Sequence, residues 1–137
     1  MKNFKMLCLL FFAGYARAGG PVAPEGWEGS FDAELPNGES CCLLADLNQS
    51  GLTGGAFVLI SSDRSEFGLF ALTYAPDAKE HWQLLEKHPM ASLKSYRFSI
   101  APPIGSLSVG IEACLAPHAC KRYSSPFAGL PLELVKK

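Results

Sequence analysis

Apolar residues along this chain fall into short runs separated by polar turns, a pattern typical of β-strands. The run at 56–61 (AFVLIS) is the most strand-like, and 67–74 (FGLFALTY) follows it after five polar residues. Two runs rich in β-branched and aromatic residues around such a connection indicate a β-hairpin. We therefore expect an antiparallel pair of strands over these residues.

Shorter runs of the same kind predict further strands at 41–46, 93–101, 107–114 and 130–135. Most of the ten prolines stand outside these runs, where they mark loops. The expected fold class is mainly β, or β-rich α+β. We expect a small single-domain antiparallel sheet or sandwich with one short helix.

Residues 77–88 fit two structures. Asp77 followed by Glu80 resembles a helix capping box, and Pro89 would end a helix. The alternation of apolar and polar side chains at 82–84 is instead that of a strand. We expect the single short helix here.

The first eighteen residues have the three parts of a secretory signal peptide. Two lysines precede the apolar run 6–13, and Ala16 and Ala18 supply the small residues that a signal peptidase recognises. The run is too short to span about 30 Å of hydrocarbon, so we expect no stable membrane insertion. Cleavage is expected after Ala18, and the protein is expected to be secreted or periplasmic.

The remaining chain divides by composition and by charge. Residues 19–40 are rich in Gly, Pro and Glu and are predicted to form an irregular N-terminal arm, with a β-rich globular domain over 41–137. Residues 19–86 carry eleven acids and two bases, whereas 87–137 carry two acids and seven bases. Folding would either neutralise this difference or leave a dipole that steers a charged partner.

The expected partner is another protein. Nucleic acid is a poor candidate, because the basic half has no arginine cluster with interleaved aromatic residues. The acidic side chains of the arm are the candidate contact surface for a protein partner: Glu25, Glu28, Asp32 and Glu34.

Four cysteines lie outside the predicted signal peptide: Cys41, Cys42, Cys114 and Cys120. An even number of cysteines in an oxidising compartment predicts disulfides, with three possible connectivities. A bridge between Cys114 and Cys120 would close a loop of five residues and leave Cys41 with Cys42. Because Cys41 and Cys42 would point to opposite faces of a strand, cross-pairing with the other two is equally compatible with the spacing.

Asp46, Asn48 and Ser50 place oxygen-bearing side chains at alternate positions before Gly51. Calcium takes six to eight oxygen ligands, and a glycine in sixth place permits the sharp turn of a calcium loop. Over residues 42–74 the chain resembles the FG-GAP/VCBS type of β-repeat, whose loop has the motif Asp-x-Asn-x-Asp-Gly-x-x-Asp before an apolar strand. The resemblance implies a calcium loop within a structural or interaction module.

This loop departs from the repeat at two ligand positions, where Ser50 and Gly54 replace aspartates. We therefore expect weak calcium binding or none, because affinity follows the charge of the ligands. The alternative role of Asp46, Asn48 and Ser50 is to cap backbone N–H groups of their own loop. No other cofactor is expected.

Catalytic signatures are weak. Ser108 lies in a segment that approaches the G-x-S-x-G elbow but lacks its first glycine. Of the three histidines, His81, His88 and His118, the first two have no carboxylate or cysteine at ligand spacing with both. We expect a non-enzymatic exported binding protein, such as an inhibitor or immunity-type protein that blocks a secreted protein with an exposed loop. The alternatives are an FG-GAP-like structural module and a small secreted hydrolase that uses Ser108 or a carboxylate pair.

Overall fold

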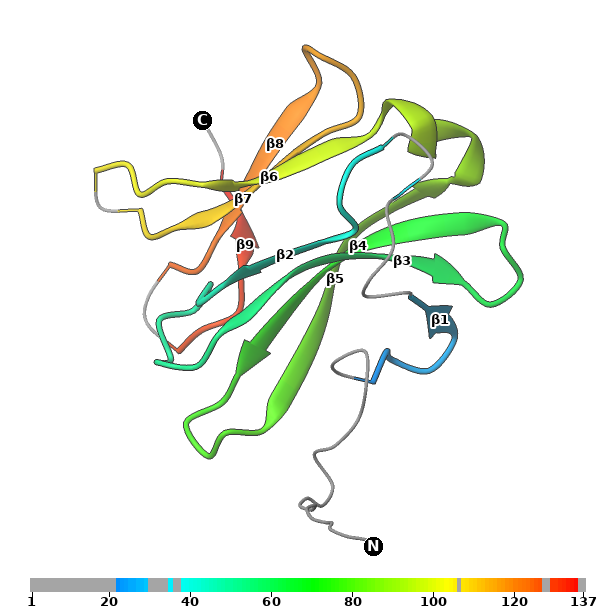
Figure 1. Cartoon of the computed structure of the whole chain (residues 1–137). Helices are drawn as coiled ribbons and strands as arrows, with labels where there is room; N and C mark the ends of the chain where they lie inside the picture. Colours follow the sequence, from blue (N-terminus) through cyan, green and yellow to red (C-terminus); the bar gives the residue numbers. More distant parts are fainter. Residues whose placement is uncertain (1–21, 30–34, 36–37, 106, 127–128, 136–137) are drawn as a thin grey trace, which may run out of the picture.

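The computed structural model describes residues 22–29, 35, 38–105, 107–126 and 129–135. They form two antiparallel sheets (Figure 1). In the first sheet the order is β1-β3-β4-β5, and β2 also pairs with β3; the second sheet has the order β6-β7-β8-β9. The strand bounds are β1 Trp27–Glu28, β2 Cys42–Ala45, β3 Gly54–Ser61, β4 Glu66–Tyr74, β5 Glu80–Pro89, β6 Arg97–Ala101, β7 Gly110–Cys114, β8 Cys120–Ser124 and β9 Glu133–Leu134. The mainly β fold class is confirmed.

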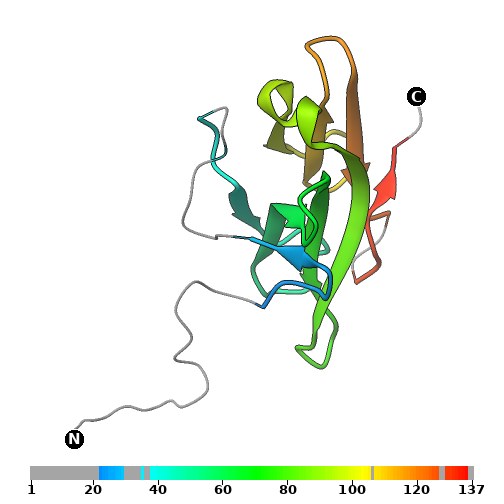
Figure 2. The same cartoon turned by 90° about the vertical axis from the view of Figure 1, so that its right-hand side faces the viewer.

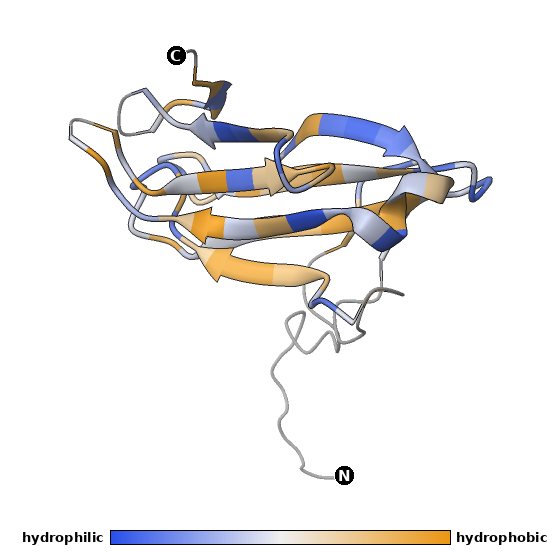
Figure 3. Ribbon diagram, turned by 90° about the horizontal axis from the view of Figure 1, so that it is seen from above, coloured by the Kyte–Doolittle hydropathy of each residue, from blue (hydrophilic) through white to orange (hydrophobic). Residues whose placement is uncertain are grey.

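The two sheets pack around one main core, as the side view shows (Figure 2). Val58 and Leu69 contribute to this core from β3 and β4, while Ile111 and Tyr123 contribute from β7 and β8. Gln83 joins β5 to the segment before β9 through its side-chain amide. Its Nε2 donates a hydrogen bond to the backbone oxygen of Leu132, and its Oε1 accepts one from the backbone N–H of Leu132. Polar and apolar segments follow one another along several strands (Figure 3), as expected for strands with one solvated face.

The predicted hairpin is confirmed as β3 and β4, with Ala56 opposite Ala71 and Val58 opposite Leu69. These two strands are buried on both faces. Their outer face carries a second cluster that includes Phe57 and Phe70, and residues 22–28 contribute Trp27 to it. The Trp27 ring lies 5.0 Å from that of Phe70, measured between centroids. An aromatic side chain of the predicted arm therefore covers the sheet.

The helix expected at 77–88 is wrong. Most of this segment lies in β5, which pairs with β4 along its length. Glu80 is opposite Tyr74 at one end of the pair, and Pro89 is opposite Glu66 at the other. A short isolated helix is marginal in water, whereas β4 offers a full ladder of backbone and side-chain partners. The only helical segment among the described residues is the short 3-10 helix η2, Met90–Ser95, which begins after Pro89.

Several strand boundaries also differ from those expected, and the strand predicted at 130–135 is only the two residues of β9, Glu133–Leu134. The strand predicted at 93–101 begins only at Arg97, because η2 occupies 93–95. The strand predicted at 107–114 begins at Gly110. A Cβ at Gly110 would lie 2.3 Å from the backbone oxygen of Tyr123, so this close approach to β8 requires glycine.

Within the described residues, no helix has the length and apolarity needed to cross a membrane.

Candidate functional site

A β-bulge in β5 sets the geometry of the site. Phe70 pairs with Leu84 and Leu69 pairs with Glu86, which leaves Leu85 as an extra residue on β5. Leu84 is exposed, whereas Leu85 packs against the main core. In a regular strand Glu86 would then face outward again, but the extra residue turns its side chain to the inner side.

The Glu86 carboxylate joins three segments of the chain. Its Oε1 accepts a hydrogen bond from the hydroxyl of Tyr123 on β8 at 2.5 Å. Its Oε2 accepts one from the hydroxyl of Tyr96 at 2.9 Å, and lies 2.8 Å from Nε2 of His88. The Glu86 side chain is only 10% exposed. This carboxylate therefore fixes β8 and the start of β6 to β5.

The protonation states follow from these contacts. Burial alone would raise the pKa of Glu86, but the hydrogen bonds from Tyr123, His88 and Tyr96 outweigh it and hold that pKa below its usual range. Burial, together with the neighbouring carboxylate, raises the pKa of both tyrosines. At neutral pH the cluster is an ionised carboxylate held by two protonated phenols. Because the phenols remain donors, the Glu86 carboxylate links strands of the two sheets. We call Glu86 together with Tyr96, Tyr123 and His88 the brace.

The loop between β7 and β8, residues 115–119, is closed by the Cys114–Cys120 disulfide. Two backbone bonds tighten it: Leu115 N–H donates to the Ala119 oxygen at 3.1 Å, and Ala119 N–H donates to the Ala116 oxygen at 3.0 Å. Residues 116–119 are nevertheless all exposed. The loop is therefore both fixed in shape and accessible.

The other two cysteines, Cys41 and Cys42, also lie at disulfide distance from one another. Of the connectivities that the sequence left open, the structure thus has the pairing of sequence neighbours. Cys41 is buried in the main core, and Cys42 begins β2.

Two hollows flank the 115–119 loop. The smaller, of about 210 Å³, lies between the loop and the Glu86 carboxylate, and its lining includes Glu86, His88, His118 and Lys121. The larger, of about 380 Å³, lies between the loop and the turn from the end of η2 into β6. Its lining includes Lys94, Arg97, Ala116 and Pro117. Each hollow borders the loop, so a partner that contacts the loop also meets these side chains.

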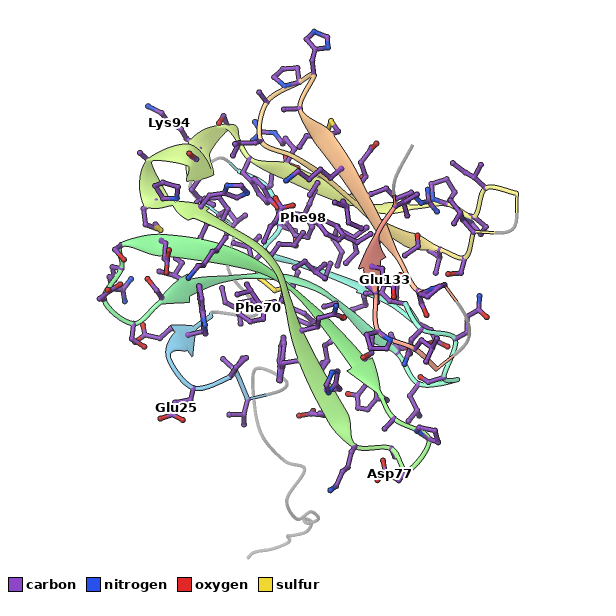
Figure 4. All side chains as sticks on the ribbon, turned by 180° about the vertical axis from the view of Figure 1, so that it is seen from behind. Glu25, Phe70, Asp77, Lys94, Phe98 and Glu133 are labelled. Carbon is purple, nitrogen blue, oxygen red and sulfur yellow. A yellow bond between two sulfur atoms is a disulfide. The ribbon has the colours of Figure 1, made fainter. Side chains whose placement is uncertain are left out.

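Exposed cations gather near one end of the molecule. Figure 4 shows Lys94 beside η2 at this end, and Glu25 and Asp77 toward the other end. The exposed cations Lys94, Arg97 and Lys121 thus lie around the 115–119 loop.

The predicted calcium ligands engage their own loop and its neighbours. Asp46 accepts hydrogen bonds from the backbone N–H groups of Ser50, at 2.9 Å, and Gly51, at 2.8 Å. The Asn48 amide donates to the Tyr74 backbone oxygen at 3.0 Å. The Asp46 contacts are those of the capping alternative, whereas Asn48 instead ties the loop to the end of β4. Among the described residues no group of three or more His, Cys, Asp or Glu side chains is arranged to hold a metal, and calcium binding stays a prediction.

The other predicted site residues lie apart from the brace. Glu25 is exposed, and Glu28 pairs with Arg64 at 3.3 Å. Asp32 and Glu34 lie outside the described residues. Ser108 donates from its hydroxyl to the Ser125 backbone oxygen at 3.2 Å.

Glu86 was not among the site residues predicted from the sequence. Its spacing of two from His88 places both side chains on one face of a strand, and this signal was lost because a helix was expected there.

Comparison with known proteins gives no match: no family model, no curated protein and no solved structure is significantly similar to this chain.

Proposed function

We propose that this protein is an exported, non-enzymatic binding protein that engages another protein through the 115–119 loop. The observation that carries the proposal is the combination of closure and exposure in that loop. The Cys114–Cys120 disulfide and two backbone bonds hold it, while residues 116–119 remain accessible. A loop that is already ordered loses little conformational entropy when it binds.

The composition of the loop supports a protein partner. Ala116, Pro117 and Ala119 give its exposed surface an apolar centre, and charged side chains stand around it. Protein interfaces have this layout, with an apolar centre poor in charge and a polar rim. An inhibitor or immunity-type protein that inserts the loop into a recess of a secreted protein is the form of this function that the shape supports best.

Differential capture of a partner tests the proposal. The purified protein, with both disulfides intact, is immobilised and exposed to the secreted and envelope fractions of its source organism. Ala116→Arg enlarges an exposed side chain in the loop without removing a recorded side-chain contact. Ser62→Arg, in the exposed turn between β3 and β4, is the matched control.

The proposal predicts a partner that the wild type and Ser62→Arg retain equally and that Ala116→Arg loses. Equal retention by all three proteins would contradict a role for the loop. Failure of the wild type to retain any partner from either fraction would contradict the binding function.

Export is tested separately by intact-mass analysis of the native protein. We expect a chain that begins at Gly19 and is four hydrogens lighter than the fully reduced chain, because two disulfides remove four thiol hydrogens. A native chain that retains its first eighteen residues and all its thiols would contradict export.

A further inference from the structure

The larger hollow beside the loop presents two cations on one wall. Lys94 and Arg97 line it, and Ala116 and Pro117 of the 115–119 loop face them. Lys94 is exposed at the end of η2, and its side chain has no ion pair recorded among the described residues. The cations lie three residues apart, on either side of the turn from η2 into β6.

The Arg97 guanidinium is held in place from one side. Its Nη1 donates to the backbone oxygen of Tyr96 at 2.9 Å and of Lys94 at 3.4 Å. Its Nε lies 3.9 Å from a carboxylate oxygen of Glu39, which therefore competes for the guanidinium. Nη2 forms no hydrogen bond with the described residues, so this nitrogen can donate a hydrogen bond to a ligand. A guanidinium held from one side can donate a charge-assisted hydrogen bond from its remaining nitrogen to a carboxylate.

We propose that this hollow binds a carboxylate side chain of the partner protein, an Asp or Glu at the edge of the recess that receives the loop. The inference rests on the proposed function and names the chemistry of the partner. A protein carboxylate fits better than a polyanion, because two cations beside an apolar loop form a mixed surface rather than a continuous basic stripe. Opposite charge at such a rim accelerates association and sets orientation.

A defined probe tests the site without the partner. The purified protein, with both disulfides intact, is titrated with a hexaglutamate peptide at about 10 mM salt, where surface charges are little screened. A hexaglutamine peptide and inorganic phosphate are titrated in parallel. Amide chemical shifts report where each probe binds. Lys94→Gln removes one cation, and Lys79→Gln, in the exposed turn between β4 and β5, is the matched control.

The inference predicts that hexaglutamate shifts amides of 94–97 and 115–119, and that Lys94→Gln weakens its binding about two- to fivefold, the effect of one exposed ion pair. Lys79→Gln and hexaglutamine should show no such effects. Three results would overturn the inference: no shifts at these residues, equal weakening by both substitutions, or phosphate binding there as tightly as hexaglutamate. If partner capture is still lost in Ala116→Arg, any of them overturns only the carboxylate site and leaves the proposed function standing.

Discussion

The carboxylate of Glu86 on β5 accepts a hydrogen bond from the hydroxyl of Tyr123 on β8, two residues that are 37 positions apart in the chain. This contact crosses from one sheet to the other, and Tyr123 follows Cys120 by three residues on the same strand. The brace therefore positions the strand that leaves the 115–119 loop. A change at Glu86 is expected to act on both stability and loop position.

Replacing Glu86 with Gln tests the brace. The substitution keeps the size of the side chain but removes the charge that three donors share, and we expect the free energy of unfolding to fall by about 1–3 kcal/mol, the range for hydrogen bonds to a charged group. Glu80→Gln, on an exposed position of the same strand, should change it little. Denaturant unfolding measures both. Equal stabilities of the two variants would show that the brace contributes nothing.

Stability should depend on pH at both extremes. The pKa of Glu86 is lowered in the folded state, so its contribution is lost as the pH falls below about 4.5 and through the folded pKa. The pKa of Tyr96 and of Tyr123 is raised, so their contribution is lost as the pH rises above about 10. Unfolding measured across pH should show both declines. Replacing both tyrosines with Phe should flatten the alkaline one, and an unchanged alkaline slope would contradict the assignment.

The 46–51 loop is expected to be stabilised by Asp46 as a backbone cap. Because Asp46 accepts the N–H groups of Ser50 and Gly51, Asp46→Ala should destabilise the protein by about 0.5–2 kcal/mol, as the loss of other capping side chains does. The loss should be the same with calcium and with a chelator. A rise in melting temperature on adding calcium, absent in Asp46→Ala, would instead support the calcium loop implied by the FG-GAP/VCBS resemblance.

Gly68 provides room for Trp27 on the outer face of the first sheet. A Cβ at Gly68 would lie 2.9 Å from Cδ1 of Leu84, 3.0 Å from Cε1 of Phe70 and 3.2 Å from Cη2 of Trp27. Gly68→Val should therefore displace Trp27 and lower the free energy of unfolding by about 1–3 kcal/mol, as overpacking does. Its cost should shrink in a Trp27→Ala background, because neighbours couple. If Gly68→Val and Trp27→Ala lower the free energy of unfolding by strictly additive amounts, the side chain added at position 68 does not clash with Trp27.

The parts of the fold that local pattern determines could be predicted from the sequence. The hairpin of β3 and β4 was predicted because both strands are continuous apolar runs beside a polar turn. β5 was not, because a capping pattern at Asp77 competed with strand alternation, and only pairing with β4 decides between them. The pairing of Cys114 with Cys120 was one of the predicted options, since a short loop separates them.

The brace could not be predicted, because it depends on a bulge and on distant partners. Whether Glu86 faces the core is decided by the extra residue Leu85, and no local pattern marks that position. Tyr123 reaches Glu86 only after the second sheet packs on the first. The site therefore results from tertiary structure, whereas the loop beside it was visible as a cysteine spacing.

The most direct test of the binding function is the affinity of the captured partner for the wild type and for a Cys114→Ser/Cys120→Ser double variant. The variant frees the five residues of the loop, and ordering them again on binding should weaken affinity at least about tenfold. Cooperative unfolding of the variant checks that the rest of the fold persists. A folded variant that binds the partner as tightly as the wild type would contradict a binding loop held in shape by its disulfide.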